Sequence, residues 1–403
     1  MKLERWREIV RKYFPEYVLP AEIVLSVVCQ LAIKDVTNPF GLVLVDRPSS
    51  GKTIVLNFFS KYKELVYVTD AFTASSFVTH ASNRKKEELE GLDLLPRIKH
   101  KVFVVRDLAP IFGMRDDDLL KVMGILTRVF DGEGLTTDSG LYGRRGYKGD
   151  YLFMFLAAST PIKGRVWKVM GNFGSRLFFL NMGIPDKGVE VLAKQLRSKY
   201  SPKQKEIRCR KATKKLLEEI FSGVKSVVWD RQNENEELLK EIATISKLVA
   251  SLRGMVNFRI SDKDGFDFND TQVEKADRIN QAFYNLARGH AFACGRRQIN
   301  DEDIAIALKV ALSSAPWDRV KFFKLLIDNG GKLKTDDVIE ELKVSRPTAL
   351  KLIAIFKQLN IIYKEEVILA SGGHLWVNKI SPEFSWFIGP RFKELMRLIQ
   401  SHI

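Results

Sequence analysis

A short segment at residues 41–53, GLVLVDRPSSGKT, constrains the fold more than any other part of the chain. Its first part, Leu42–Val45, is continuously apolar, which predicts a strand buried in a parallel sheet. Turn-forming residues follow at Ser49 to Gly51, and a helical pattern then covers Ile54–Lys61. A strand that turns sharply into a helix directs backbone N–H groups and the positive end of the helix dipole to one point, as in a phosphate-binding loop.

The side chains of this loop suit the chemistry of a nucleoside triphosphate. Lys52 can place its ammonium on the β- and γ-phosphates, and the Thr53 hydroxyl can bind Mg²⁺. We therefore predict ATP and Mg²⁺ as cofactors, with these binding residues: Pro48, Ser49, Ser50, Gly51, Lys52 and Thr53. The loop departs from GxxxxGK[ST] at its first position, where Asp46 stands in place of glycine. A chance turn on a surface loop is the alternative, and the flanking strand and helix count against it.

The 403 residues include 65 Lys and Arg against 49 Asp and Glu, a net charge of +16 that favours a polyanionic partner such as nucleic acid. A generally basic proteome would give the same excess. Three cysteines, at 29, 209 and 294, form no CxxC pair and indicate neither a zinc site nor a disulfide framework, so we expect a cytoplasmic protein. The longest apolar run, Ile23–Ile33, is too short to cross a bilayer, and we expect no membrane segment.

Four further apolar runs have the pattern of buried strands. Two helices are expected before residue 38, and the predicted strands are Leu65–Thr69, Val102–Val105, Tyr151–Ala158 and Leu177–Met182. Five apolar strands separated by helices indicate a three-layer α/β domain over residues 1–186. For residues 187–312 we expect a basic connector, either beside a nucleic-acid channel or with a solvated face, and then a helical bundle without strands.

Residues 313–403 are predicted to form a winged-helix domain. The pattern gives a helix from Trp317, a second from Thr335, a third with Ser345 as N-cap, and two strands, Ile361–Leu369 and His374–Ile380. Arg346 and Lys351 lie on the polar side of the third helix and are candidate DNA contacts. A protein-binding module is the alternative.

The strand Val102–Val105 leads to the candidate hydrolytic residue, Asp107. A carboxylate there can orient Mg²⁺ or activate the attacking water. Arg106 occupies the position where the first carboxylate of an acidic pair is expected, so the pair is incomplete. The alternative is that Asp107 caps the next turn.

Residues 131–150, dense in glycine and turn formers, predict a β-hairpin with the segment Gly143–Gly149 at its tip. Arg144, Arg145 and Lys148 surround a tyrosine there, a composition suited to binding phosphates and stacking on bases. An ordinary solvated loop is the alternative.

These segments occur in the order seen in AAA+ ATPases, and the chain resembles the branch that holds the minichromosome-maintenance helicases, the MoxR proteins and the magnesium chelatases. The resemblance covers residues 17–312, with a winged helix appended as in the minichromosome-maintenance proteins. RPSSGKT is similar to Walker A, and the strand before Asp107 is similar to Walker B. FLAASTP resembles the sensor 1 segment and places Thr160 where the family usually has asparagine.

Two arginines acquire roles through the same resemblance. GSRLFFL is similar to the SRF motif, which implies that Arg176 is an arginine finger acting on a neighbouring subunit. Arg278 resembles the sensor 2 arginine of the helical lid. The family likeness thus implies a homo-oligomer, typically a hexameric ring, that hydrolyses ATP between subunits. Stretches such as DLLPRIKHK also resemble a prokaryotic group of such ATPases, which implies no particular activity.

Three functions remain in competition. The leading one is a DNA motor, a helicase or translocase of the ring-forming kind. The second is a nucleotide-dependent DNA switch or loader with slow hydrolysis, in plasmid, phage or defence biology. The third is a MoxR-like protein remodeller. The hairpin cations and net charge favour the first two, and the incomplete acidic pair favours the second over the first. A protein partner is expected to supply targeting.

Overall fold

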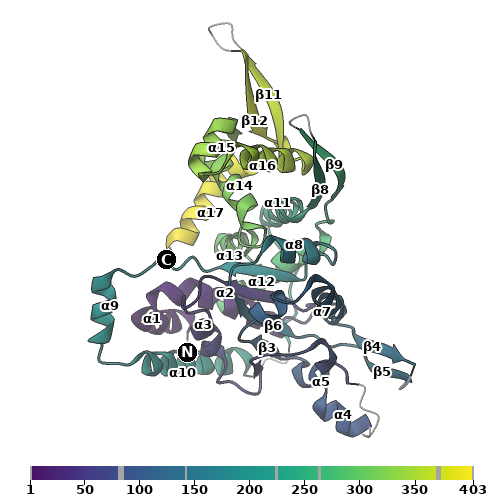
Figure 1. Ribbon diagram of the computed structural model, residues 1–403. Helices are drawn as coiled ribbons and strands as arrows, with labels where there is room; N and C mark the ends of the chain where they lie inside the picture. The colour runs from purple at the N-terminus through teal and green to yellow at the C-terminus, as the bar shows by residue number, and fades with distance from the viewer. Residues whose placement is uncertain are drawn as a thin grey trace.

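The computed structural model describes residues 2–79, 86–140, 143–222, 226–261, 265–368 and 374–401 (Figure 1). Its centre is a five-stranded parallel sheet with the strand order β2-β3-β6-β1-β7. These strands are β1 (Gly41–Val45), β2 (Val66–Thr69), β3 (Val102–Val105), β6 (Met154–Ser159) and β7 (Leu177–Asn181). All five predicted strands are confirmed. The fourth begins three residues later than predicted, at Met154 rather than Tyr151.

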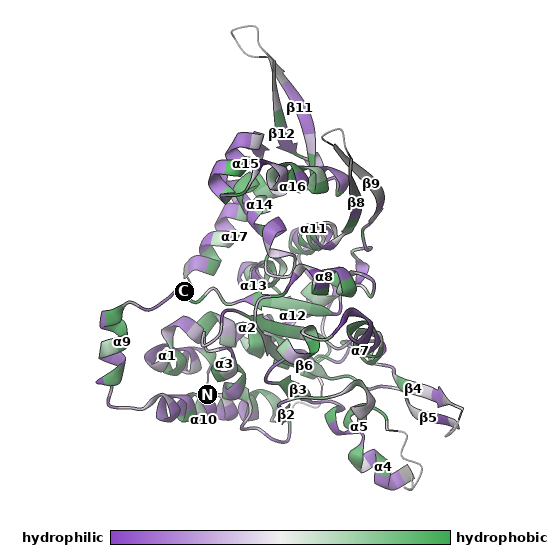
Figure 2. Ribbon diagram, viewed as in Figure 1, coloured by the Kyte–Doolittle hydropathy of each residue, from purple (hydrophilic) through white to green (hydrophobic). Residues whose placement is uncertain are grey.

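Helices cover both faces of this sheet, because its strands are apolar on both sides. Leu42 and Phe178 point into one core, which they share with α1 (Leu3–Tyr13), α2 (Val18–Cys29), α3 (Lys52–Phe59), α10 (Pro202–Phe221) and α12 (Asp277–Ala293). Val43 and Phe179 point into the other core, with α5 (Leu94–Ile98), α6 (Ala109–Phe112), α7 (Asp116–Val129) and α8 (Gly164–Gly171). The short α4 (Lys86–Leu92) precedes α5. Figure 2 shows the hydrophobic colour concentrated on α12 and the central strands.

The apolar character of the N-terminal region comes from α2. Within the described residues, the stretch Pro15–Ala32 is long and apolar enough to cross a bilayer, and 83% of it is buried inside the protein. Every residue of α2 itself is buried, and the helix packs along α12. The apolar residues of this stretch therefore pack inside the protein, as in the core helix of a globular domain.

The structure of residues 187–312 differs from the sequence prediction. It holds α9 (Val189–Leu196), α10, α11 (Glu236–Arg253), α12 and α13 (Asp301–Ala311), but also an antiparallel hairpin of β8 (Met255–Ser261) and β9 (Gly265–Gln272). The prediction of a bundle without strands was wrong. Val256, Phe258 and Ile260 alternate with polar residues, which is a strand pattern. The long helical patterns on either side masked this short alternation.

The C-terminal region has the predicted order of three helices and a hairpin. These elements are α14 (Trp317–Asp328), α15 (Thr335–Leu342), α16 (Arg346–Gln358), β11 (Ile362–Ile368) and β12 (His374–Ile380). A short β10 (Lys332–Leu333) pairs with β12, which makes a three-stranded sheet, and Ser345 stands at the N-cap of α16. Residues 369–373, which connect the two predicted strands, lie outside the described residues. Sequence patterns missed α17 (Pro390–Ser401), which packs against α13.

Parallel strands place the candidate residues at two opposite edges of the central sheet. Val45 pairs with Ser159, and Val105 pairs with Ala157, so the loops that follow β1, β3 and β6 leave the sheet at one edge. Gly41, at the start of β1, pairs with Leu177 at the start of β7. Residues that precede β7 therefore lie at the other edge.

Candidate functional site

The loop between β1 and α3 depends on two residues in the left-handed backbone region. Ser49 has φ 64° and Gly51 has φ 88°. A Cβ atom on Gly51 would lie 1.9 Å from the Tyr17 hydroxyl oxygen, so this position accepts only glycine without rearrangement. The helix α3 begins directly at Lys52, two residues earlier than the sequence pattern predicted. Its first N–H groups are therefore part of the loop.

The Lys52 ammonium lies inside the curve of this loop. Its Nζ donates to the carbonyl oxygens of Asp46 (2.8 Å) and Arg47 (2.6 Å) and to Ser50 Oγ (3.3 Å). Burial lowers the pKa of Lys52, and the nearby carboxylates of Asp46 and Asp107 oppose that shift. The ammonium is thus held by the carbonyl oxygens of the loop at the start of α3.

Asp46, the departure from the phosphate-loop pattern, has a structural role that sequence reasoning missed. It is buried, with 8% of its surface exposed. Its Oδ1 accepts the N–H of Arg47 (2.7 Å), and its Oδ2 accepts the N–H of Ile184 (3.0 Å) in the segment after β7. A glycine could make neither bond. Asp46 therefore ties the loop to the strand neighbouring β1.

Asp107 follows β3 at the same edge of the sheet and is exposed. Its Oδ1 accepts the N–H of Ala109 (2.8 Å), so the capping role considered as an alternative is present. Its second oxygen makes no hydrogen bond within the described part of the chain, which leaves one carboxylate oxygen for a cation. Arg106 turns away and pairs with Asp70 at 2.7 Å. Thr160 follows β6 at this edge and is exposed, as are Thr53 and Pro48.

A cavity of about 510 Å³ adjoins the loop. Asp46 and Arg47 line it, together with Ile184 after β7 and the indole rings of Trp167 and Trp317. Sequence patterns gave no sign of it, because its walls come from four segments that are far apart in the chain. Its volume is that of a small-molecule site.

Arg176 and Arg278 meet at the opposite edge of the sheet. Asp131 Oδ1 accepts from Arg176 Nη2 (3.2 Å) and from Arg278 Nη2 (2.9 Å). Arg176 also donates to the carbonyl oxygens of Thr127 and Phe173. Burial lowers the pKa of Arg176, and the neighbouring Arg278 cation adds to that effect. The structure therefore brings the two predicted arginines together, and it separates both from Lys52 of the same chain.

The predicted hairpin is present as β4 (Gly134–Ser139) and β5 (Gly143–Lys148), but its cations lie along β5 and not at the tip. The glycine-rich composition of the segment placed the turn too late, and residues 141–142 lie outside the described part. Arg145 faces Asp93, with 3.6 Å between Nη2 and Oδ2, and the Tyr147 hydroxyl donates to the same oxygen at 2.7 Å. Arg144 and Lys148 are exposed. Two of the three cations are therefore available to a ligand.

The candidate DNA contacts of α16 differ in their surroundings. Arg346 is exposed and pairs with Asp336 at 3.5 Å, also on the surface. Lys351 places its ammonium 4.9 Å from the centre of the Phe258 ring on β8. The hairpin that sequence analysis missed thus borders the predicted recognition helix.

Comparison with known proteins assigns no family to this chain. No model of a protein family matches it, and no curated protein matches it either. Function is therefore inferred from the loop around Lys52, from the two edges of the sheet and from the charges placed there.

Proposed function

We propose that the chain is an ATPase of the AAA+ type that acts on DNA with ATP and Mg²⁺. The observation that carries this proposal is the position of the Lys52 ammonium. It lies inside the loop between the parallel strand β1 and the helix α3, in which Ser49 and Gly51 have left-handed backbone angles. Asp107 stands close enough to act on it electrostatically. That arrangement binds the β- and γ-phosphates and a metal ion in nucleotide hydrolases.

The AAA+ assignment is supported by the strand order β2-β3-β6-β1-β7 and by the placement of Thr160 at the same edge as the loop. A winged-helix assignment for the C-terminal region is supported by three helices followed by a hairpin, with β10 as its third strand. Both assignments agree with the resemblance that the sequence motifs indicate.

The proposal that the chain assembles into a homo-oligomer is supported by the position of Arg176. Arg176 lies next to the start of β1, and the loop follows the end of β1. The five residues of this strand therefore separate Arg176 from the loop by about 16 Å, at the usual rise of a strand. Arg176 can therefore serve a phosphate only across a subunit interface. An interface that joins one edge of a subunit to the other edge of its neighbour is heterologous, and such interfaces form a ring when the rotation between subunits closes. We propose a hexameric ring, in agreement with the family resemblance.

The DNA-acting role is supported by the net charge and by Arg144 and Lys148 on the exposed side of β5. A DNA motor and a DNA switch or loader differ in the rate of ATP hydrolysis that they need. A motor needs fast hydrolysis, whereas a switch or loader needs only slow turnover. Arg106 stands where the other carboxylate of the acidic pair is expected and pairs with Asp70. The acidic pair is therefore incomplete, and this favours the slower switch as the second candidate.

The test is the ATPase rate of the purified protein, alone and with single- or double-stranded DNA. Stimulation by DNA is the expected result, while equal rates with and without DNA would favour a protein remodeller. Lys52→Ala should abolish ATP binding, because it removes the cation that meets the β- and γ-phosphates. The matched control is Lys61→Ala, an exposed lysine just beyond the end of α3. Unchanged ATP affinity in Lys52→Ala would refute the nucleotide site.

A further inference from the structure

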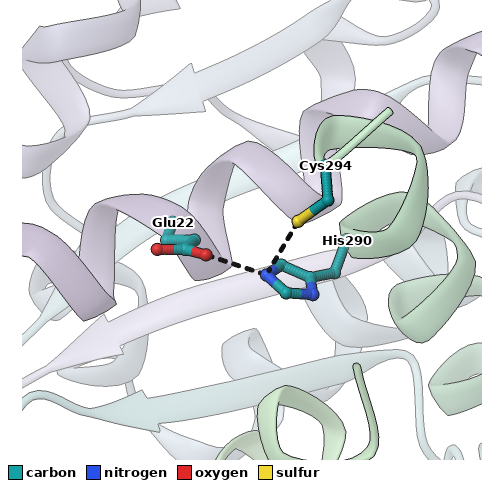
Figure 3. Close-up of side chains that lie close together, drawn as sticks. All are labelled: Glu22, His290 and Cys294. Atoms are coloured by element: carbon teal, nitrogen blue, oxygen red, sulfur yellow. Dashed lines mark hydrogen bonds and ion pairs between the residues drawn. The ribbon is translucent and has the colours of Figure 1, made fainter. Parts of the chain in front are cut away.

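A second cluster of chemically active side chains lies between α2 and α12, and the nucleotide site does not use it (Figure 3). His290 Nε2 is 2.8 Å from Glu22 Oε1 and 3.7 Å from Cys294 Sγ. The three ligand atoms lie within 4.8 Å of one another. Glu22 and His290 are buried, and Cys294 is partly exposed.

The cluster is built from two helices, α2 and α12, that pack against each other. His290 and Cys294 are four residues apart on α12 and its C-cap, so they share one face. Glu22 comes from α2, 268 residues away in the sequence. The helices meet at Gly289, where an added Cβ would lie 2.1 Å from the Ser26 carbonyl oxygen. That glycine lets the next residue, His290, reach the carboxylate of Glu22.

A second set of contacts holds two of the three side chains in place. His290 Nδ1 is 2.5 Å from Asp303 Oδ1, and Arg296 fixes Asp303 with bonds of 2.6 and 2.9 Å. Arg7 holds both oxygens of Glu22. A carboxylate on Nδ1 sets the histidine tautomer with Nε2 turned to the other ligand atoms, as metal-binding histidines are commonly oriented.

We propose that Glu22, His290 and Cys294 form a Zn²⁺ site, with one oxygen, one nitrogen and one sulfur ligand. Zinc accepts this mixture of donors. With bonds of about 2.0–2.3 Å, tetrahedral ligands lie about 3.6 Å apart for nitrogen and sulfur and about 3.4 Å for nitrogen and oxygen. The distance from His290 to Cys294 already fits. The Glu22 oxygen, at 2.8 Å from Nε2, has to draw back by about 0.6 Å.

One of the three proposed ligand residues also borders a cavity. Cys294 lines a cavity of about 590 Å³, together with Arg7 and Glu302, and this cavity can supply a water molecule. Zinc binds histidine as the neutral imidazole and cysteine as the thiolate, so binding at this site should release protons and depend on pH. The alternative is a purely structural ion network among Arg7, Glu22, His290 and Asp303. Such a network does not explain why the Cys294 thiol lies 3.7 Å from His290 Nε2.

The test uses metal-free full-length protein and Co²⁺ as a spectroscopic probe for the zinc position. Wild type should bind one Co²⁺ per chain with thiolate-to-cobalt charge-transfer absorption, and Zn²⁺ should displace it. Cys294→Ser should lose that absorption. Cys209→Ser is the matched control, because Cys209 is a buried cysteine outside the cluster, and it should retain the absorption. Circular dichroism establishes that each variant is folded.

Two results would overturn the proposal. One is the absence of charge-transfer absorption in Co²⁺-treated wild type, and the other is equal absorption in Cys294→Ser. Thermal unfolding adds an independent measurement, since a metal that binds only the folded state raises the melting temperature. Zn²⁺ should raise the melting temperature of wild type and of Cys209→Ser but not of Cys294→Ser. An ion network without metal predicts no effect of Zn²⁺ on any of the three.

Discussion

Arg176→Ala tests whether hydrolysis needs two subunits. ATP binding should be retained, because Lys52 and its loop lie at the other edge of the sheet. Hydrolysis should fall by about 10³-fold or more, the usual contribution of an arginine that stabilises transition-state charge. Asp131 keeps its bonds to Arg278 and Arg128, both at 2.9 Å, so the variant leaves no unpaired carboxylate and should fold.

Arg128→Ala is the matched control, since Arg128 also pairs with Asp131 but its side chain is 63% exposed. Its ATPase rate should stay close to that of wild type. A comparable loss in both variants would mean that Asp131, and not an arginine acting on phosphate, is what hydrolysis requires.

Mixing two inactive variants supplies the decisive measurement. Lys52→Ala subunits still carry Arg176, and Arg176→Ala subunits still carry an intact loop. In an equal mixture, about a quarter of the heterologous interfaces should join an intact loop to an intact arginine, so about a quarter of the wild-type rate should return. The assay is steady-state ATP hydrolysis after subunit exchange, with co-purification of differently tagged subunits as proof of mixing. No recovered activity in proven mixed assemblies would refute action across the interface.

Three further predictions concern the loop glycine, Asp107 and the cations of β5. Gly51→Ala should destabilise the folded protein by about 1–2 kcal/mol for the left-handed backbone alone, and more for the clash, as measured by thermal unfolding. Gly91→Ala, a helical glycine with open space around it, should be neutral or stabilising. Asp107→Asn should bind ATP but not hydrolyse it, and persistent turnover would make Asp107 a cap only. Arg144→Ala with Lys148→Ala should weaken DNA binding and reduce the log–log salt slope by about 0.9 per lost duplex phosphate contact, and an unaltered slope would exclude the hairpin.

The central sheet could be predicted from sequence because each strand is buried on both faces and so reads as an unbroken apolar run. The loop could be predicted because its glycine and lysine stand next to such a run. The hairpin of β8 and β9 escaped prediction, since its alternation is short and lies between two long helical patterns. Local pattern thus identifies elements best where burial is most complete.

Contacts between side chains that are far apart in the sequence could not be predicted. Arg145 was predicted to contact DNA, and nothing nearby in the sequence shows that the buried Asp93 faces it. The Glu22, His290 and Cys294 cluster was missed for the same reason, because a search for paired cysteines does not detect a carboxylate 268 residues from its histidine. Each such contact depends on how helices pack, and the residue types alone leave many pairings open.

If the chain is a nucleotide hydrolase as proposed, its departures from the hydrolase pattern should affect nucleotide binding and hydrolysis differently. Asp46 strengthens the loop, because its carboxylate bonds to Arg47 and Ile184 where glycine has no side chain. Arg106 has the opposite effect, since it stands where the other carboxylate of the acidic pair is expected and pairs with Asp70. Asp107 can then orient the metal or activate water, but no carboxylate stands next to it in the sequence for the other task. ATP binding should therefore be ordinary and its hydrolysis slow. A protein with that balance would spend most of its cycle in the ATP-bound assembly, which is the reason to keep a timed DNA switch as the second candidate beside a motor that must hydrolyse ATP at every step.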